Sequence, residues 1–218
     1  MKIGLLGGTF NPVHIGHLRL AIEALEVYSL DRVWLVPAYI SPHKKQENIL
    51  PYPYRLQMLN LALEGLEKIE ISTVEEKLGG ISYTVKTLDY LNKNYTQDDF
   101  YFILGDSDFL SLPTWYKGNT LLDYTSLIVI RRNNIDLQEL SQFAFSFLQV
   151  EKETTWGWKK GKNEVLLLNS LDINISSSSI RRKFLNHRNL SFLLPAKVEF
   201  FLEENRNLVE KFWREKEK

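Results

Sequence analysis

Two histidines near the N-terminus are spaced for joint contact with one anion. His14 and His17 stand three residues apart at the end of the segment GGTFNPVHIGH, residues 7–17. On a helix this spacing places both imidazoles on the same side. A helix that opens at Gly16–His17 also directs its first N–H groups and the positive end of its dipole at a ligand. Two imidazoles beside a helix N-terminus predict a cradle for phosphate.

The residues in front of the histidines suit the same role. Gly7 and Gly8 directly follow the apolar residues 2–6, and without side chains they let a bulky ligand approach the backbone. Asn11-Pro12 is a turn signal. Two alternatives stay open at this point: Gly-Gly after a strand also makes an ordinary tight turn, and His-x-x-His can be half of a metal site.

A serine-rich segment far along the chain offers a second set of phosphate ligands. ISSSSIR spans residues 175–181 at the start of an expected helix. Ser177 or Ser178 can cap that helix, and several hydroxyl and N–H groups can hydrogen-bond phosphate oxygens. Arg181 follows within about one turn, where its guanidinium can bind a phosphate through two N–H groups. A polar helix start with a solvated arginine is the plainer alternative.

Strand and helix patterns alternate along the whole chain and must position these segments. Apolar runs predict strands at residues 2–6, 32–38, 69–73, 100–105, 126–132 and 164–169. Stripes of helical period predict helices around residues 18–25, 56–66, 85–91, 137–147, 176–187 and 195–212. Residues 39–55 read as a mobile loop and residues 152–163 as a connecting loop. This order predicts an α/β fold with a doubly wound, mainly parallel sheet.

Length and composition limit the classes of protein that fit. The 218 residues predict a single domain over residues 1–218, with an α/β core in 1–170 and a helical C-terminal segment in 171–218. The 27 basic and 27 acidic side chains balance, so no nucleic-acid partner is expected. No signal peptide or membrane span is recognisable, which favours a cytoplasmic protein with no membrane partner. The sequence leaves a homo-oligomer open.

The two phosphate segments together resemble the signatures of the nucleotidyltransferase superfamily that carries an HxGH motif, here His14-Ile15-Gly16-His17. The chain looks most similar to the bacterial nicotinate-nucleotide adenylyltransferases, which share segments resembling VPAYISPHKK, YRLQML, SYTVKTL, LPTWY and LIVIRR. The resemblance implies a Rossmann-like fold. It also implies transfer of AMP from ATP to nicotinate mononucleotide, which gives deamido-NAD and pyrophosphate. Mg²⁺ is then expected to arrive with ATP, because no dedicated carboxylate cage is visible in the sequence.

The resemblance also assigns site residues. His14, His17 and Arg181 are the expected catalytic residues, and ATP is expected to bind Gly7, Gly8, Thr9, Phe10, His14, His17, Ser176, Ser177, Ser178 and Arg181. Nicotinate mononucleotide is expected to bind Lys44, Thr84, Trp115 and Tyr116. Backbone N–H groups near Thr84 would hold the nicotinate carboxylate, Trp115 would stack on the pyridine ring, and Lys44 would bind the phosphate, with Arg55 as a second candidate. No protein-held metal is expected.

Some residues depart from the family pattern. Relatives usually carry Gly-x-Asp after the fourth strand, whereas Ser107 stands third here between Asp106 and Asp108. The sequence leaves open which aspartate takes that place, and Asp-x-Asp is also a short metal-binding pattern. Asn11 stands where aspartate is frequent. A different acceptor, such as nicotinamide mononucleotide or phosphopantetheine, and a non-catalytic nucleotide sensor are the competing functions.

Overall fold

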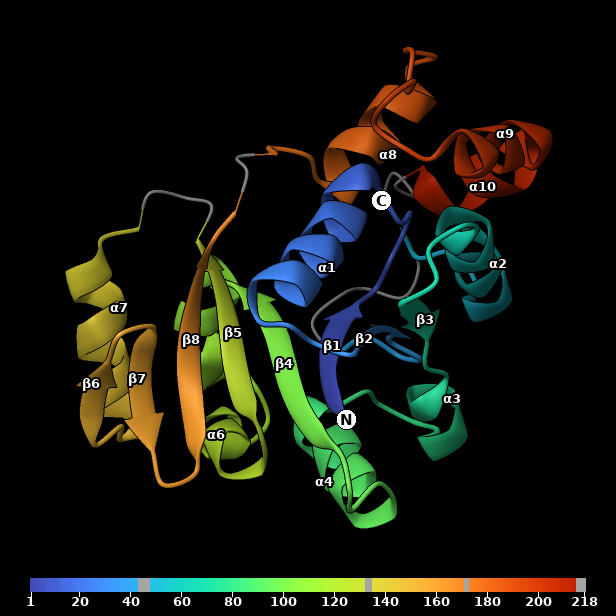
Figure 1. The fold of residues 1–218 in the computed structure, drawn as a ribbon. Coiled ribbons are helices and arrows are strands. Elements are labelled where there is room, and N and C mark those ends of the chain that lie inside the picture. The colour runs from blue at the N-terminus through green and yellow to red at the C-terminus, as the bar shows by residue number, and fades with distance from the viewer. Residues whose placement is uncertain (43–47, 132–134, 171–172, 215–218) are drawn as a thin grey trace.

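The computed structural model describes residues 1–42, 48–131, 135–170 and 173–214. Their strands form one sheet in the order β3-β2-β1-β4-β5-β8-β7-β6 (Figure 1). The strands are β1 Lys2–Gly8, β2 Arg32–Pro37, β3 Ile69–Ile71, β4 Asp99–Gly105, β5 Ser126–Arg131, β6 Lys152–Thr154, β7 Gly157–Lys160 and β8 Asn163–Asn169. All neighbours from β3 through to β8 pair in parallel, so the predicted doubly wound α/β sheet is confirmed.

Strand order reverses beside β1, and this reversal creates the place for a ligand. From β1 the chain first builds outward through β2 and β3, and it then returns to add β4 on the other side of β1. The connections on the two sides diverge over opposite faces of the sheet, which leaves a crevice beyond the carboxyl ends of β1 and β4. Gly7 and Gly8 are the last residues of β1, so the first predicted phosphate segment begins at this crevice.

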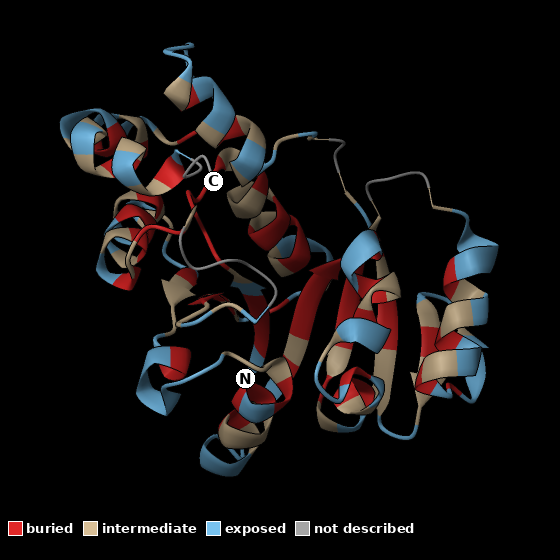
Figure 2. Ribbon diagram, turned by 180° about the vertical axis from the view of Figure 1, so that it is seen from behind, coloured by how far each residue is buried: buried red, intermediate tan, exposed pale blue. Residues whose placement is uncertain are grey.

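Helices cover both faces of the sheet because its strands are apolar on both sides. One hydrophobic cluster joins the sheet to α1, α2 and the C-terminal helices α8, α9 and α10, and the other joins it to α3 through α7. Figure 2 shows the buried strands between these layers. The helices are α1 Ile15–Val27, α2 Tyr52–Leu63, α3 Val74–Leu78, α4 Thr84–Asn94, α5 Asp106–Leu110, α6 Leu121–Tyr124, α7 Leu137–Phe143, α8 Ser177–Leu185, α9 Ala196–Glu204 and α10 Arg206–Trp213.

Four local expectations were wrong or incomplete. The stretch 152–163 is not a plain connecting loop, since β6 and β7 form a hairpin that extends the sheet antiparallel to β8. Trp158 supplies the driving force, because it is buried in a core cluster opposite Val165. The expected helix at 195–212 is two helices that meet at Asn205, with Pro195 as the residue before the first. Helix α2 already begins at Tyr52, inside the expected loop 39–55, and the short helix α3 was not predicted.

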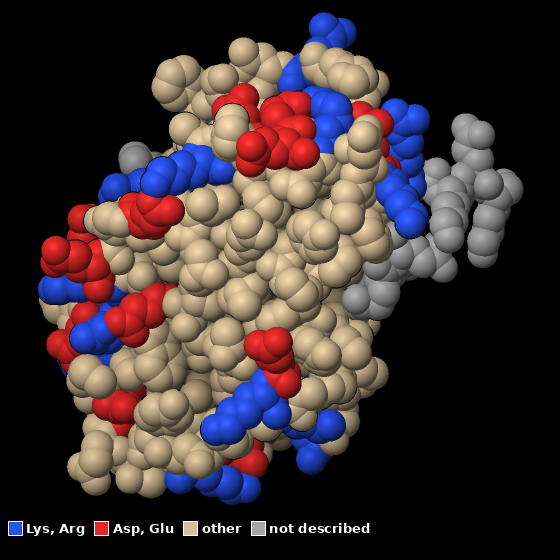
Figure 3. Space-filling view, turned by 90° about the vertical axis from the view of Figure 1, so that its right-hand side faces the viewer, with Lys and Arg blue, Asp and Glu red and all other residues tan. Residues whose placement is uncertain are grey.

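Surface charge is mixed on the side that carries α2, α3 and α9. Lys and Arg side chains alternate with Asp and Glu around a broad uncharged centre (Figure 3). Basic and acidic side chains are therefore intermixed on this face, which has no separate basic and acidic halves. None of the helices in the described part of the chain has the length and apolarity of a membrane span.

Candidate active site

The two histidines of the first segment hold each other at the start of α1. The His14 side chain caps the helix, because its Nδ1 accepts a hydrogen bond from His17 N at 3.4 Å. In return His14 N donates to His17 Nδ1 at 3.2 Å. The two rings are stacked with centroids 3.6 Å apart. The helix thus begins at Ile15 after a His14 cap, one residue earlier than expected, and both imidazoles lie at its positive end.

This reciprocal capping fixes how each ring carries its proton. A ring nitrogen that accepts a backbone N–H must be unprotonated, so neutral His14 and His17 both carry their proton on Nε2. Two parallel rings therefore present the same kind of donor. Nε2–H groups of this kind can hydrogen-bond oxygens on neighbouring phosphates. The mutual hydrogen bonds hold the two rings in fixed positions for such contacts.

Gly16 is required by the position of the His14 ring. A Cβ built on Gly16 would lie 3.0 Å from His14 Nδ1 and 3.2 Å from Cε1 of the same ring. The ring has little room to retreat, since His14 is buried and stacks against His17. The glycine of the HxGH motif therefore leaves room for the His14 ring, which lies against the first turn of the helix.

The serine segment lies against the turn before α1, so the two predicted phosphate segments are in contact. Ser177 Oγ donates to Pro12 O at 2.9 Å, and Arg181 Nη1 donates to Asn11 O at 2.9 Å. Arg181 Nη2 donates to Ser178 Oγ at 3.1 Å. The helix cap is Ser176, which accepts from Ser179 N, and not Ser177 or Ser178 as expected. Helix α8 thus starts beside the start of α1 (Figure 1).

Arg181 brings a positive charge to this junction. Burial lowers the pKa of its guanidinium, which nevertheless stays charged at neutral pH. Arg181 and Ser178 line an open hollow of about 910 Å³, and Arg182 and Arg214 line the same hollow. Three guanidinium groups and a serine hydroxyl around one hollow favour an anionic ligand with several phosphate oxygens.

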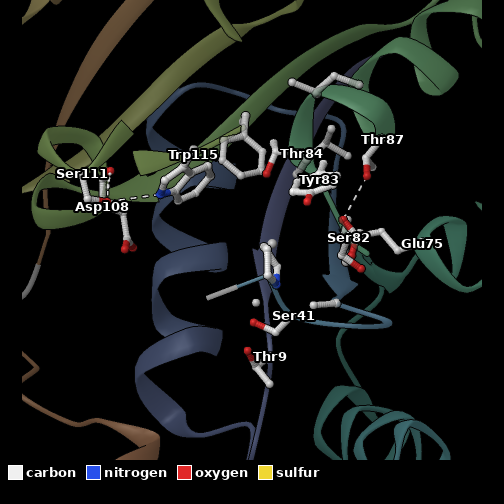
Figure 4. A pocket seen from close by; sticks show the side chains of 18 of the residues that line it. Thr9, Ser41, Glu75, Ser82, Tyr83, Thr84, Thr87, Asp108, Ser111 and Trp115 are labelled. Carbon is white, nitrogen blue, oxygen red and sulfur yellow. Dashed lines mark hydrogen bonds between the residues drawn. The ribbon is translucent and has the colours of Figure 1, made fainter. Parts of the chain in front are cut away.

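A second hollow, of about 400 Å³, lies at the carboxyl end of β1, between Trp115 and the start of α4 (Figure 4). Trp115 forms one wall, and its indole Nε1 donates to Ser111 Oγ at 3.2 Å, which fixes the ring plane. Phe102 packs edge-on against Trp115. The polar lining residues are Thr9, Ser41, Glu75, Ser82, Tyr83, Thr84, Thr87, Asp108, Ser111 and Thr114. We refer to this hollow as the ring pocket.

Helix α4 points its first turn at the ring pocket. Thr84 is the first residue of α4 and lines the pocket with Tyr83, the residue before the helix. No side chain caps this helix, and no acidic residue lies in its first turn. Its first N–H groups and the positive end of its dipole therefore suit a carboxylate at this end of the pocket.

The structure adds Glu75, Ser82 and Thr87 to the lining. Glu75 Oε1 accepts from Thr87 Oγ1 at 3.0 Å, so the glutamate ties α3 to the first turns of α4. Burial raises the pKa of the Glu75 carboxyl, which favours the neutral acid. Ser82 Oγ accepts from Tyr39 N at 2.8 Å and so joins the start of α4 to the segment after β2. Sequence patterns gave no signal for this set, because its members act through contacts between segments.

The remaining residues that the sequence assigned to substrate binding do not all lie in one pocket. Gly7, Gly8 and Thr9 line the ring pocket, while Phe10 is buried and its ring packs edge-on against His17. Tyr116 is not a lining residue of the ring pocket, and its ring packs against Tyr83. Lys44 lies outside the described residues.

Arg55, the second candidate for the acceptor phosphate, points inward. It is buried, and its guanidinium donates to Thr9 O at 2.8 Å, Leu50 O at 3.0 Å and Tyr39 O at 3.3 Å. Burial lowers the pKa of Arg55 to about 10, so the group remains charged at neutral pH. These contacts make Arg55 a brace for the backbone around the site, with its donors directed at carbonyl groups.

The aspartates after β4 have different surroundings. Asp106 is fully buried at the start of α5, where its Oδ1 accepts from Ser107 N at 2.8 Å. Asp108 is exposed and lines the ring pocket beside Ser111 (Figure 4). Asp108 is therefore the aspartate that can contact a ligand. Among the described residues no cluster of three or more His, Asp or Glu side chains has the arrangement of a metal site.

Comparison with known proteins agrees with this geometry. The family model for cytidylyltransferase-like proteins matches residues 5–183. A protein of Pelobacter propionicus named "Probable nicotinate-nucleotide adenylyltransferase" is 35% identical over 210 residues, which cover 94% of this chain and 97% of the relative. One of Halalkalibacterium halodurans with the same name is 36% identical and covers 93% and 89%.

Solved structures show the same fold at low sequence identity. The Plasmodium falciparum nicotinic acid mononucleotide adenylyltransferase complexed with APC superposes with a TM-score of 0.73 at 17% identity, covering 96% of this chain and 97% of that one. The same enzyme complexed with NaAD gives a TM-score of 0.72 at 18% identity, covering 94% and 96%. Together with the sequence matches over nearly the full length, these findings show that the chain belongs to the cytidylyltransferase-like family and, within it, to the nicotinate-nucleotide adenylyltransferases.

Proposed function

We propose that this protein transfers AMP from MgATP to nicotinate mononucleotide and releases deamido-NAD and pyrophosphate. The observation that carries the proposal is the junction of the two phosphate segments, in which Ser177 and Arg181 bind the carbonyls of Pro12 and Asn11. The ring pocket opens at the end of β1, which leads directly into this junction. We also infer that residues 1–218 act as one domain and that the protein is cytoplasmic.

The donor occupies the junction. His14 and His17 donate from Nε2 to oxygens on the α- and β-phosphates, and the N–H groups of the first turn of α1 add positive potential there. Arg181, the Ser178 hydroxyl and the backbone N–H groups at the start of α8, at Ser176, Ser177 and Ser178, bind the β- and γ-phosphates, while the Ser177 hydroxyl stays bonded to Pro12 O. Mg²⁺ enters with ATP as part of the substrate, and it neutralises charge on the phosphates that leave as pyrophosphate.

The acceptor occupies the ring pocket. The pyridine ring stacks on Trp115, and its carboxylate meets the first N–H groups of α4 at Thr84. Tyr116 supports this end of the pocket through its contact with Tyr83. Lys44 binds the 5′-phosphate from the segment after β2.

The chemistry needs no covalent intermediate. An oxygen of the acceptor 5′-phosphate attacks the α-phosphorus of ATP, and the bond from that phosphorus to the bridging oxygen of the β-phosphate breaks. The bonding electrons leave with pyrophosphate. The protein aligns two anionic substrates and stabilises charge as it builds on the α-phosphate and the leaving group. The resemblance implies a preference for the acid over the amide acceptor, and the uncapped start of α4 at Thr84, with no acidic residue in its first turn, supports it.

Pyrophosphate release from MgATP tests the reaction directly. The assay is run in parallel with nicotinate mononucleotide and with nicotinamide mononucleotide as acceptors. Fast release with the acid and slow release with the amide supports both the reaction and the role of α4. Equal rates with the two acceptors would support adenylyl transfer but would contradict the proposal that the start of α4 recognises the nicotinate carboxylate. ATP binding without pyrophosphate release from either acceptor would refute the proposal in favour of a nucleotide sensor.

A further inference from the structure

Glu75 places a buried carboxyl group in the wall of the ring pocket, and no step of the proposed reaction uses it. The residue is only 9% exposed and lines the pocket. Its Oε1 accepts from Thr87 Oγ1 at 3.0 Å, whereas its Oε2 is buried and no group in the described part of the chain hydrogen-bonds it. A buried carboxylate with one unpartnered oxygen is costly, and the neutral acid is less so. The wall therefore favours the neutral acid.

The surroundings of Glu75 leave this carboxyl able to ionise. The titratable and polar groups that face it are Arg55 and Tyr52 from α2, Tyr39 from the segment after β2, and Ser82, Lys86 and Thr87 from the region where α4 starts. Hydrogen bonding by Ser82, Thr87 and the backbone of Tyr39 favours the ionised form, as does the charge of Arg55. Burial opposes them and is the largest influence, so the pKa of Glu75 is raised. Glu75 is neutral at low pH and ionises as the pH rises through that raised pKa.

Glu75 lies on the side of the ring pocket that is assigned to the substrate carboxylate. Figure 4 shows it beside the start of α4, near Tyr83 and Thr84 and across the pocket from Trp115. The hydrogen bond from Thr87 ties it to the same helix. A ring stacked on Trp115 with its carboxylate at the first N–H groups of α4 brings a second carboxyl group to this side. Two carboxylates in a partly desolvated pocket repel each other, whereas a carboxylate and a neutral acid do not.

We propose that Glu75 is a specificity-determining residue for the acceptor. As a neutral acid it leaves the positive end of α4 free to bind the nicotinate carboxylate. As a carboxylate it offsets that positive end and favours an acceptor that lacks the negative charge, such as the amide. The proposal rests on the proposed function, which places the nicotinate carboxylate at this helix end. The effect is electrostatic, so it requires no contact between Glu75 and the substrate.

Titration calorimetry on the full chain tests the proposal. The binding of nicotinate mononucleotide and of nicotinamide mononucleotide is measured between about pH 5 and pH 8, with saturating α,β-methylene-ATP present. The two ligands share the 5′-phosphate, so its titration cancels in the ratio of their dissociation constants, acid over amide. We expect this ratio to rise roughly tenfold toward the upper end in wild type, which corresponds to one pKa unit of coupling between the carboxylates. Buffers of different ionisation enthalpy should show proton uptake with the acid in excess of that with the amide.

Two variants and a matched control separate the charge of Glu75 from its packing. Glu75→Gln still accepts from Thr87 and stays neutral, so its ratio should remain at the low-pH value of wild type throughout. Thr87→Val removes a donor that favours the ionised form, so the pKa of Glu75 rises further and the increase in the ratio should move to higher pH. Glu76→Gln makes the same substitution at the next residue of α3, which is exposed and is not a lining residue of the ring pocket. Its ratio should follow wild type at every pH.

The outcomes distinguish this proposal from the proposed function. A flat ratio in wild type, or an equal rise in wild type and Glu75→Gln, would overturn the role of Glu75. If the amide does not bind, the pH dependence of acid binding in wild type and Glu75→Gln decides, and equal profiles would overturn the role. If Glu75→Gln does not fold, Thr87→Val decides, and an unshifted profile would count against Glu75. Acid binding without pyrophosphate release would refute the proposed function alone, whereas failure of both mononucleotides to bind would refute the assignment of the ring pocket and this inference with it.

Discussion

Replacement of Gly16 by alanine is expected to damage catalysis without destabilising the protein. The new Cβ would lie 3.0 Å from His14 Nδ1, which is closer than carbon and nitrogen atoms pack comfortably. The His14 ring must then shift by a few tenths of an ångström, which disturbs its stacking on the His17 ring, whose centroid is 3.6 Å away. A displacement of 1 Å in an active site can cost about a hundredfold in rate. We therefore expect kcat to fall roughly tenfold.

The stability change combines two terms of opposite sign. Alanine in place of glycine inside a helix stabilises by up to about 1 kcal/mol. Weakening of the His14 cap costs about the same amount. The two terms nearly cancel, so the melting temperature is expected to move by no more than about 2–4 °C in a chain of this length. Steady-state kcat with MgATP and nicotinate mononucleotide, together with a thermal melt, measures both effects.

A double substitution isolates the contact between Gly16 and His14. In a His14→Ala background the ring is absent, so the added Gly16→Ala change should leave kcat where His14→Ala puts it and should raise the melting temperature. If Gly16→Ala has wild-type kcat, or if its loss persists unchanged in the His14→Ala background, the steric reasoning is refuted.

Three further predictions concern separate parts of the site. His17→Ala should lower kcat by roughly tenfold to a thousandfold through loss of a donor to the phosphates, and near-normal turnover would contradict that role. Trp115→Ala should raise the KM for the acceptor and spare the KM for ATP; an effect confined to ATP would overturn the stacking assignment. Burial raises the pKa of Glu75 above 4.5, so its stabilising contribution is complete below that pH and is lost as pH rises through the folded pKa. Glu75→Gln should remove this loss, and denaturant titrations between about pH 4 and pH 8 should show its advantage growing with pH.

The parts of the fold that the sequence predicted are those with strong local patterns. Apolar runs located every parallel strand, because strands covered on both faces are largely apolar and keep their polar residues mainly at the ends. The hairpin of β6 and β7 was missed because its strands, KET and GWKK, are short and mostly polar, and Trp158 is their one buried hydrophobic residue. Helix α3 spans five residues, too few for a helical period to appear.

The candidate site likewise contains residues that local sequence predicted and residues that only the structure revealed. Residue type and position pointed to His14, His17 and Arg181, since imidazole and guanidinium groups at helix starts can bind phosphate, and the structure brings their segments into contact. Residue type gave no warning for Glu75 or Trp213. Glu75 accepts a hydrogen bond from Thr87, and Trp213 donates one to Asn11, a contact between positions 202 residues apart. No local pattern encodes such a pair.

The junction of the two phosphate segments depends on the backbone more than on side-chain identity. Ser177 and Arg181 both bind carbonyl oxygens, those of Pro12 and Asn11, in the turn between β1 and α1. A carbonyl oxygen is present whatever residue occupies the position, so the docking of α8 does not depend on the side chain at position 11. The side chain at that position remains available for another task. In this chain its amide donates to Asn48 O, which a carboxylate could not do, and the same amide accepts from the last residue of α10. A carboxylate oxygen could still accept from Leu50 N and Trp213 Nε1, so of the three side-chain hydrogen bonds of Asn11 only the one to Asn48 O requires the amide.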